Sequence, residues 1–501
     1  MCGVLGLWVN DDAFPYLHQG LMGIQHRGQD SAGIITYDGR FHTKKGNGLV
    51  RDVFKEEHLH RLTGPIGIGH TRYPTIGGGR GEDAQPFQLN SPFGIIMAHN
   101  GNVVNYAEIK KTLFETHHRL LNSDCDVESI LNVFAQSLEE QAATVLEPRH
   151  VFEAVQRVYR TVIGSYSVVA YIAEQGMVAF RDPFGIKPLV WGVKKGVGKP
   201  AFAFASETVS LNLMGFGDIQ DVGAGSAIFI DRDRKVHIEK LADKPHSPCL
   251  FEWVYFARPD AFIDDANVYR VRVHLGSLLA EDIRKLDLPI DVVVPVPDSA
   301  RDAAIEIART LNLAYREALV KNRYIGRTFI MPGQEARRNS VHLKLNPIVR
   351  EFKGKDVLLV DDSIVRGTTS RAIVEMVREC GARNIYFAST SPPLRHPCVY
   401  GIDMQTRTEF VARNRSFDQI AAFMGADKVI YQSLDNLKKA VRMENPELRN
   451  FCAACFDGEY ITGDVSAEML QSIEDARQGV IENQLDLALT GVRSSGELVE
   501  P

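Results

Sequence analysis

The sequence has no long hydrophobic run and no excess of positive charge. A bilayer-spanning helix needs about 20 consecutive apolar residues, whereas the longest apolar runs here, such as Val357–Val360, have the length of strands. The 501 residues carry a formal net charge of −6. A protein that binds nucleic acids or membrane surfaces needs positive charge instead. We therefore expect neither a nucleic acid nor a membrane as a partner, and small-molecule chemistry instead.

The chain also lacks a secretion signal and an even set of cysteines. Met1–Gly6 contains no basic leader ahead of an apolar segment. The seven cysteines are spread over a long chain, which favours free thiols, catalysis or metal binding over a disulfide framework. We therefore expect a cytoplasmic protein. A composition of 45% hydrophobic and 24% charged residues excludes wholesale disorder, and the length predicts at least two domains.

The first half of the chain alternates short apolar runs, punctuated by glycine, with helical patterns. Residues with apolar side chains three and four apart predict helices that cover sheets. The expected strands are Ala32–Ile35, Gly94–Met97, Tyr166–Ile172 and Ala227–Ile230, and the expected helices are Ala107–Leu121 and Val127–Leu146. The polar segment Asp231–His246 is expected to leave this domain.

The second half has a different pattern, in which valine-rich runs alternate with helical stretches. Runs that are apolar on both faces indicate a parallel sheet covered on both sides, whose ligands bind beyond the carboxyl ends of the strands. The expected strands are Asp291–Val296, Val357–Val360 and Asn384–Ala388, and the expected helices are Ala303–Leu311 and Thr369–Cys380. Gly491–Pro501 has no hydrophobic periodicity and is expected to be a frayed tail.

Cys2 becomes the first residue of the chain once Met1 is removed. An α-amine titrates near 7.7 to 8.0 and a thiol near 8.5, so the amine can take the thiol proton directly or through a water. The thiolate can then attack an amide carbonyl to give a thioester and ammonia. Cysteine at position two is weak support by itself, because an ordinary initiator dipeptide looks the same.

Three further motifs strengthen this interpretation: His26-Arg27-Gly28-Gln29-Asp30, Gly69-His70-Thr71-Arg72-Tyr73-Pro74-Thr75 and Ala98-His99-Asn100-Gly101-Asn102. Singly, Asn100-Gly101 would be a hairpin turn and Arg72 a surface charge. Together, after Cys2-Gly3, they resemble the N-terminal nucleophile glutamine amidotransferases. The resemblance implies a four-layer αββα domain over residues 1–240 with Cys2 as nucleophile. The Asn100 side-chain amide and the Gly101 N–H would form its oxyanion hole.

The same resemblance implies the residues that bind glutamine. Arg72 would bind the α-carboxylate, because a guanidinium matches a carboxylate with two hydrogen bonds, and Arg27 belongs to the same binding set. Asp126 would bind the α-ammonium. Asp124 competes for that role. We favour Asp126 because Glu128 follows two residues later, as in the family pattern, although the usual hydroxyl residues are replaced by Cys125 and Val127.

An apolar run, two carboxylates and a small-residue turn follow one another in residues 357–370. The carboxylates can accept hydrogen bonds from two ribose hydroxyls, and backbone N–H groups at the start of the next helix can hold a phosphate. A bare Asp-Asp-Ser would be a capped turn, but the whole string resembles the phosphoribosylpyrophosphate signature of type I phosphoribosyltransferases. The resemblance implies a parallel-sheet domain over residues 241–463, with ligand-binding residues Asp361, Asp362, Arg366, Gly367, Thr368, Thr369 and Ser370.

Two other segments agree with a phosphate ligand. Val294–Ser299 resembles the family's pyrophosphate loop, and Mg²⁺, which prefers carboxylate, water and phosphate oxygens, would lie beside Ser299, Asp361 and Asp362. Residues 321–344 contain six Lys or Arg against one acid, which suggests an anionic ligand or a solvated basic loop. This segment resembles the family's mobile loop, with three expected ligand-binding residues: Lys321, Arg323 and Tyr324.

Four other cysteines are candidates for a tetrahedral sulfur site: Cys249, Cys398, Cys452 and Cys455. Their spacing is compatible with zinc, a [4Fe–4S] cluster, separate free thiols or a redox pair. Their surroundings, Pro248–Glu252 and Pro397–Asp403, resemble the cluster-containing branch of the glutamine phosphoribosylpyrophosphate amidotransferases. That implies a structural [4Fe–4S] cluster which clamps the carboxy-terminal segment to both domains. No evident propeptide precedes Cys2, so removal of Met1 alone is expected to mature the chain.

The resemblance covers the chain from Cys2 to about Gly463 and leaves 464–501 as a helical extension and tail. It implies that glutamine is hydrolysed through a Cys2 thioester and that ammonia attacks C1 of the bound ribose, giving 5-phosphoribosylamine for purine synthesis. Family members are homotetramers inhibited by purine nucleotides, and we expect both properties here. Two alternatives remain. One is another amidotransferase with this glutaminase domain, which Asp361–Ser370 disfavours. The other is a phosphoribosylpyrophosphate-sensing regulator, which would not need Cys2, Asn100 and the basic loop together.

Overall fold

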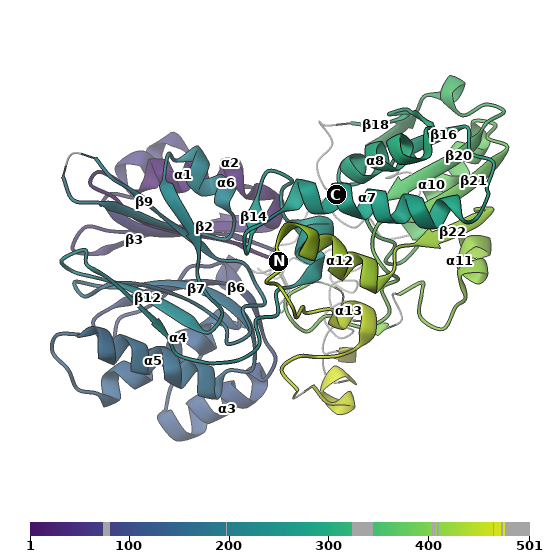
Figure 1. The fold of residues 1–501 in the computed structure, drawn as a ribbon. Coiled ribbons are helices and arrows are strands. Elements are labelled where there is room, and N and C mark those ends of the chain that lie inside the picture. Colours follow the sequence, from purple (N-terminus) through teal and green to yellow (C-terminus); the bar gives the residue numbers. More distant parts are fainter. Residues whose placement is uncertain are drawn as a thin grey trace, which may run out of the picture.

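The structure is a computed structural model that describes residues 1–73, 81–196, 198–322, 344–402, 404, 406–407, 410–463, 465–471 and 474–475. Figure 1 shows two domains, with the amino terminus lying between them. Among the described helices, none is both long enough and apolar enough to cross a bilayer.

The amino-terminal domain contains two antiparallel sheets that pack face to face (Figure 1). The first has the order β11 (Gly217–Asp221), β9 (Val190–Lys194), β10 (Ala201–Ala205), β1 (Gly3–Trp8), β4 (Ile66–Arg72), β2 (Ser31–Tyr37), β3 (Phe41–Asn47). The second has the order β13 (Val236–Lys240), β12 (Ser226–Asp231), β8 (Gly176–Arg181), β7 (Gly164–Ile172), β6 (Ile95–Val103), β5 (Phe87–Leu89).

Helices cover the outer face of each sheet. On the first sheet lie α1 (Phe14–Gly23), α2 (Val50–Val53) and α6 (Thr208–Leu213), and on the second lie α3 (Tyr106–His117), α4 (Val127–Glu140) and α5 (Pro148–Thr161). Three apolar cores separate the four layers, one beneath α1, one between the sheets and one beneath α4 and α5. The predicted αββα arrangement is confirmed.

Two predicted helices end earlier than expected, and one predicted connection is a strand. The helix predicted to reach Leu121 ends at His117, because His118 adopts a left-handed conformation with φ 54°. The helix predicted to reach Leu146 ends at Glu140. The polar segment expected to leave the domain contains β13, which pairs with β12 at the sheet edge. A polar edge strand lacks the apolar alternation by which a sequence signals a strand.

The second domain is a five-stranded parallel sheet. Its order is β17 (Ala314–Tyr315), β16 (Val292–Pro295), β20 (Asp356–Asp361), β21 (Asn384–Ser389), β22 (Lys428–Tyr431). One face packs against α7 (Val268–Arg284) and α8 (Arg301–Leu311), and the other against α10 (Thr368–Glu379) and α11 (Phe417–Met424). Side chains of β20 are therefore buried on both sides, as its continuous apolar run predicts.

A further apolar core joins the two domains. It combines the chain's first residue, the connection after β13 and the segment that follows the parallel sheet. The connection contains a π-helical turn, Glu252–Phe256, and a small hairpin, β14 (Phe262–Ile263) and β15 (Ala266–Asn267). The later segment contains α12 (Leu434–Glu444) and α13 (Ala454–Asp457). In the second domain, β18 (Leu319–Lys321) pairs with β19 (Leu345–Pro347) as a separate two-stranded sheet.

Candidate active site

Cys2 lies just before β1, where the two sheets of the first domain face each other. Its backbone N–H donates to Asn100 Oδ1 at 2.9 Å, and its thiol lies 3.6 Å from the Tyr73 carbonyl oxygen. Both Cys2 and Asn100, on β6, are buried. Since the Cys2 nitrogen becomes the α-amine after removal of Met1, Asn100 already holds that nitrogen beside the thiol.

Asn100 has a second polar atom available for substrate. Its Nδ2 is buried and has no hydrogen-bond partner within the described part of the chain. An unpaired buried amide N–H costs free energy, so this donor is suited to an oxygen that arrives with the substrate. The next residue must be glycine, because a Cβ at Gly101 would lie 1.9 Å from the Ser165 carbonyl oxygen.

Arg27 lies beneath the nucleophile with its guanidinium fully buried. Its Nε donates to the Cys2 carbonyl oxygen at 2.9 Å, and its two terminal nitrogens pair with Glu207 at 2.6 Å and Glu252 at 2.8 Å. Burial opposes the charge, but the two carboxylates together raise the pKa of Arg27. Burial likewise favours neutral Glu207, yet His26 and Arg27 hold the pKa of Glu207 at about 2. These contacts direct Arg27 toward the protein's own backbone and acids.

Arg72 and Asp126 lie close to Asn100. Arg72 ends β4, is buried, and its guanidinium lies 3.7 Å from Asp83. Asp126 precedes α4, accepts from the Val103 N–H at 2.8 Å and lies 3.3 Å from His99 Nε2. Burial favours the neutral acid, but His99, the Val103 N–H and Arg72 together lower the pKa of Asp126. The first domain therefore holds a buried anion beside β6, the strand that carries Asn100.

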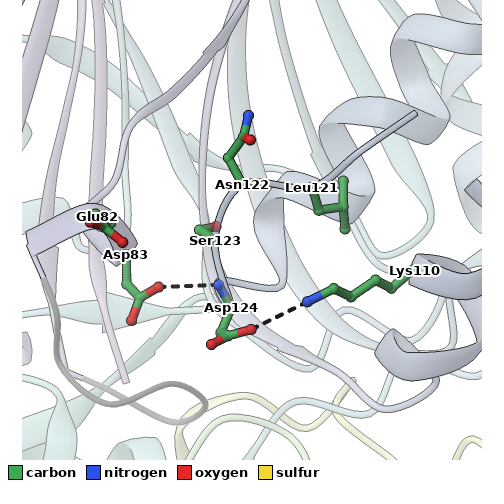
Figure 2. A pocket seen from close by; sticks show the side chains of 7 residues that line it. All are labelled: Glu82, Asp83, Lys110, Leu121, Asn122, Ser123 and Asp124. Carbon is green, nitrogen blue, oxygen red and sulfur yellow. Dashed lines mark hydrogen bonds and ion pairs between the residues drawn. The ribbon is translucent and has the colours of Figure 1, made fainter. Parts of the chain in front are cut away.

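Asp124 points in a different direction. Figure 2 shows it in a small surface pocket, where its carboxylate lies 3.3 Å from Lys110 and its backbone N–H donates to Asp83 at 3.2 Å. The pocket is lined by Glu82, Asp83, Lys110, Leu121, Asn122, Ser123 and Asp124. Asp124 is exposed whereas Asp126 is buried. Of the two aspartates, Asp126 is the one that contacts β6, the strand that carries Asn100.

The predicted phosphoribosyl residues gather at the carboxyl end of the parallel sheet. Asp361 ends β20 and Asp362 follows it; the Ser299 hydroxyl donates to Asp362, which also accepts from Ser363 at 2.6 Å. Burial, and for Asp361 the neighbouring carboxylate as well, raise the pKa of both acids. Such a pair of closely spaced oxygens suits a ligand rich in hydroxyls or a divalent cation.

Gly367 begins the turn into α10, where the predicted phosphate cradle lies. It caps the helix with φ 72°, a left-handed conformation that glycine adopts without steric cost. Thr368, Thr369 and Ser370 form the first turn, whose N–H groups have no partner within the helix. Arg366 directly precedes this turn. The elements thus place a helix amino terminus beside Asp361 and Asp362.

The basic segment is described only at its two ends. Lys321, the last residue of β18, forms an ion pair with Asp298 at 2.7 Å and so reaches the predicted pyrophosphate loop. Arg323 and Tyr324 lie outside the described residues.

The four predicted sulfur ligands come from three separate parts of the chain, yet all four are buried in the interdomain core. The backbones at Cys249 and Cys452 form a parallel β-bridge. The Leu250 N–H donates to the Cys452 carbonyl oxygen at 3.1 Å, and the Cys452 N–H donates to the Pro248 carbonyl oxygen at 3.0 Å. Burial raises the pKa of Cys249 to about 11. Within the described residues, no three Cys, His, Asp or Glu side chains form a ready site for a metal ion.

The buried cation Lys187 indicates which kind of group the four cysteines of this core could bind. Its side chain is fully buried, its ammonium lies 2.8 Å from Met1 Sδ, and it interacts electrostatically with three of the cysteines, Cys249, Cys398 and Cys452. A buried cation requires a counter-charge. Four thiolates would bring negative charge to this place, so the donor set fits a cysteine-ligated group.

Two acids of the nucleophile site, Glu207 and Glu252, were not predicted as site residues. Glu252 lies in a motif that suggested only a cysteine site, and Glu207 lies in no recognised motif. Both contact Arg27 from more than 170 positions away in the sequence, and nothing local to either residue signals such a contact.

Comparisons with known proteins agree with this division. A glutamine amidotransferase domain model matches residues 71–212, and a phosphoribosyl transferase domain model matches residues 269–392. The chain is 47% identical over 503 residues to the amidophosphoribosyltransferase of Pasteurella multocida, covering 99% of this chain and 100% of that protein. It is 49% identical over 484 residues to that of Escherichia coli, covering 95% and 96%.

A solved structure is similar over almost its whole length. It is the glutamine phosphoribosylpyrophosphate amidotransferase of B. subtilis complexed with ADP and GMP, 34% identical, with a TM-score of 0.81 and coverage of 94% of this chain and 100% of that one. Full-length similarity at this identity, with both domain types in the same order, shows that the chain belongs to the amidophosphoribosyltransferase family.

Proposed function

We propose that Cys2, after removal of Met1, is the nucleophile that releases ammonia from glutamine for use at Asp361–Ser370. The observation that carries this assignment is the contact between the Cys2 nitrogen and Asn100 Oδ1 at 2.9 Å. This contact supports a buried site that combines a general base, a thiol and an amide donor. The chain's family membership supplies the overall reaction, and the residue roles are our proposal.

Each residue of the first site has a distinct task. The α-amine accepts the thiol proton, the thiolate attacks the side-chain amide carbon of glutamine, and Asn100 Nδ2 with the Gly101 N–H stabilises the oxyanion. The tetrahedral intermediate collapses to a thioester as the C–N bond breaks, and the amine returns the proton to the leaving ammonia. Water then hydrolyses the thioester to glutamate.

Arg72 and Asp126 would hold the α-carbon end of the substrate. Arg72 binds the α-carboxylate and Asp126 the α-ammonium, each as a charge-assisted hydrogen bond. We assign Arg27 a positioning role instead of a direct substrate contact, since it donates to the Cys2 carbonyl oxygen and pairs with Glu207 and Glu252.

In the second domain, Asp361 and Asp362 would bind the ribose hydroxyls, and Arg366–Ser370 the 5-phosphate. Lys321, Arg323 and Tyr324 would contact the diphosphate. Ammonia attacks C1 of the ribose, the bond from C1 to the pyrophosphate oxygen breaks, and 5-phosphoribosylamine and pyrophosphate form. Mg²⁺ would be held near Ser299, Asp361 and Asp362, and it supplies charge neutralisation of the diphosphate.

We further propose a structural [4Fe–4S] cluster at Cys249, Cys398, Cys452 and Cys455. Support comes from their common burial in the interdomain core and from the buried Lys187 beside them. Domains over 1–240, 241–463 and 464–501, a cytoplasmic homotetramer and inhibition by purine nucleotides complete the proposal. The B. subtilis relative complexed with ADP and GMP supports the last of these.

The test compares anaerobically purified wild type with Cys2→Ala in pyrophosphate release from phosphoribosylpyrophosphate and Mg²⁺. Cys2→Ala is expected to lose the glutamine-dependent reaction and keep the ammonia-dependent one, because the second site does not use the thiol. Loss of both reactions, in a variant that still binds phosphoribosylpyrophosphate, would contradict the division of labour. Iron and sulfide analysis of the same wild-type preparation tests the cluster independently of activity.

A further inference from the structure

The strand that carries the oxyanion donors is held by a segment from outside its own domain. Asn102 Nδ2, on β6, donates to the Val399 carbonyl oxygen at 2.9 Å. The Ser165 hydroxyl, on β7, donates to the backbone carbonyl oxygen of Tyr400 at 2.8 Å. Asn102 and Ser165 are direct partners across the two strands. Both side chains are buried, so these bonds are shielded from competition by water.

The backbone of the same segment also packs directly on Gly101. Gly401 has φ 100°, and a Cβ at this position would lie 2.9 Å from the Gly101 oxygen and 3.0 Å from its carbonyl carbon. The residues of 399–401, which we call the supporting segment, therefore contact β6 at the oxyanion residue itself and at the residue after it.

The supporting segment is in turn fixed by the chain that follows Cys455. The Tyr400 hydroxyl lies 2.8 Å from the Thr462 hydroxyl and accepts from the Thr462 N–H at 3.1 Å. The Tyr460 hydroxyl donates to the Pro397 carbonyl oxygen at 2.8 Å. Within the same turn, the Tyr400 N–H donates to Cys398 Sγ at 3.4 Å. The segment is thus held between β6 and β7 on one side and the chain at Tyr460 and Thr462 on the other, and it can resist displacement of β6.

We propose that the supporting segment positions the oxyanion hole, with Asn102 and Ser165 as positioning residues for glutamine hydrolysis. The inference rests on the proposed roles of Cys2, Asn100 and Gly101. Its physical basis is that donors to a developing oxyanion act only at the correct distance, so a small shift of β6 weakens them without removing them. A carboxy-terminal part of the chain then sets the efficiency of an amino-terminal site.

The test uses Ser165→Ala and Asn102→Ala, each with a matched control. Ser210 is also fully buried, and its hydroxyl donates to a single backbone carbonyl, that of Gly20 at 2.9 Å. Asn105 is a buried asparagine whose Nδ2 donates to the Thr161 carbonyl oxygen at 3.0 Å and whose Oδ1 accepts from the Ile163 N–H at 2.9 Å. Ser210→Ala and Asn105→Ala therefore remove buried side-chain hydrogen bonds that stay within the first domain.

The expected result is a fall of roughly ten-fold in kcat for glutamine hydrolysis by Ser165→Ala and by Asn102→Ala, with KM changed less than about two-fold. The ammonia-dependent rate should stay at the wild-type value. The rate of Cys2 alkylation by iodoacetamide should also be unchanged, because alkylation builds no oxyanion. Both controls should keep the wild-type ratio of glutamine- to ammonia-dependent rates.

Three results would overturn the positioning role: an unchanged kcat in both variants, an equal loss in the matched controls, or a parallel fall in the alkylation rate. The last would place the defect at the thiol and not at the oxyanion hole. A wild type that shows neither the glutamine- nor the ammonia-dependent reaction would contradict the proposed function itself, which keeps the two failures distinguishable.

Discussion

The two candidate sites differ in how far they are completed before substrate arrives. At the glutamine site, Cys2, Asn100 and Asp126 are all buried and already bonded to neighbouring strands. At the phosphoribosyl site, Asp361 and Asp362 lie side by side at a strand end, where burial raises the pKa of both and the Asp362 carboxylate further raises that of Asp361. The difference indicates that the first site is preorganised by its fold, whereas the two carboxylates of the second need hydroxyl donors or a divalent cation to stabilise their charge.

The strongest way to break the preorganised site is to remove its side-chain oxyanion donor. Asn100→Ala is expected to lower kcat for glutamine hydrolysis by about 10² to 10³, the effect of deleting one such donor. The ammonia-dependent reaction should be unaffected. Steady-state glutamate release, measured beside Asn105→Ala as a control of the same residue type, checks this; equal losses in both variants would contradict it.

The corresponding change in the second site is Asp362→Asn. Charge-assisted hydrogen bonds contribute about 1.5 to 3 kcal/mol each, so pyrophosphate release is expected to fall roughly 10² with either nitrogen source. Asp356→Asn, at the opposite end of β20, is the matched control and should change the rate little. A defect confined to the glutamine-dependent reaction would contradict the assignment of Asp362 to phosphoribosylpyrophosphate.

The two aspartates near the glutamine site give a smaller and sharper comparison. Asp126→Asn is expected to raise KM for glutamine roughly 10- to 100-fold, because it removes one charged partner of the α-ammonium. Asp124→Asn should leave KM unchanged, since Asp124 is exposed and pairs with Lys110. Glutamine titrations of both variants check this, and the reverse pattern would move the ammonium site to the pocket of Figure 2.

The smallest expected effect is on stability. Glu207 has a pKa of about 2, below its ordinary 4.5, so its charged state stabilises the fold above pH 4.5 and that stabilisation is lost as pH falls toward 2. Glu207→Gln should lower the free energy of unfolding by about 1 to 2 kcal/mol at neutral pH. The difference from wild type, measured by urea unfolding, should narrow below pH 4.5. A difference that grows on acidification would contradict the sign.

Local patterns predicted the fold and both sites well where each signal lies within one segment. The run Val357–Val360, followed by Asp361, Asp362 and a small-residue turn, predicts a buried strand, a pair of carboxylates at its end and the start of a helix. The structure has all three. Cys2 and Asn100 were found from short motifs, and the structure brings them together. Long-range pairing was not predicted: Glu207 and Glu252 meet Arg27 only through the fold, and β13 is polar because it lies at a sheet edge.

The bridge between Cys249 and Cys452 makes the second domain an insertion. The chain enters that domain and returns from it at neighbouring points, joined by two backbone hydrogen bonds. Adjacent ends are typical of domains that tolerate insertion into another chain; residues 399–401 within this one also contact β6 and β7 of the first domain. Tension between the first domain and the residues after Cys452 would likewise load this short bridge before it reached the parallel sheet. Such a pull would bypass the parallel sheet, although the sheet lies in the middle of the sequence.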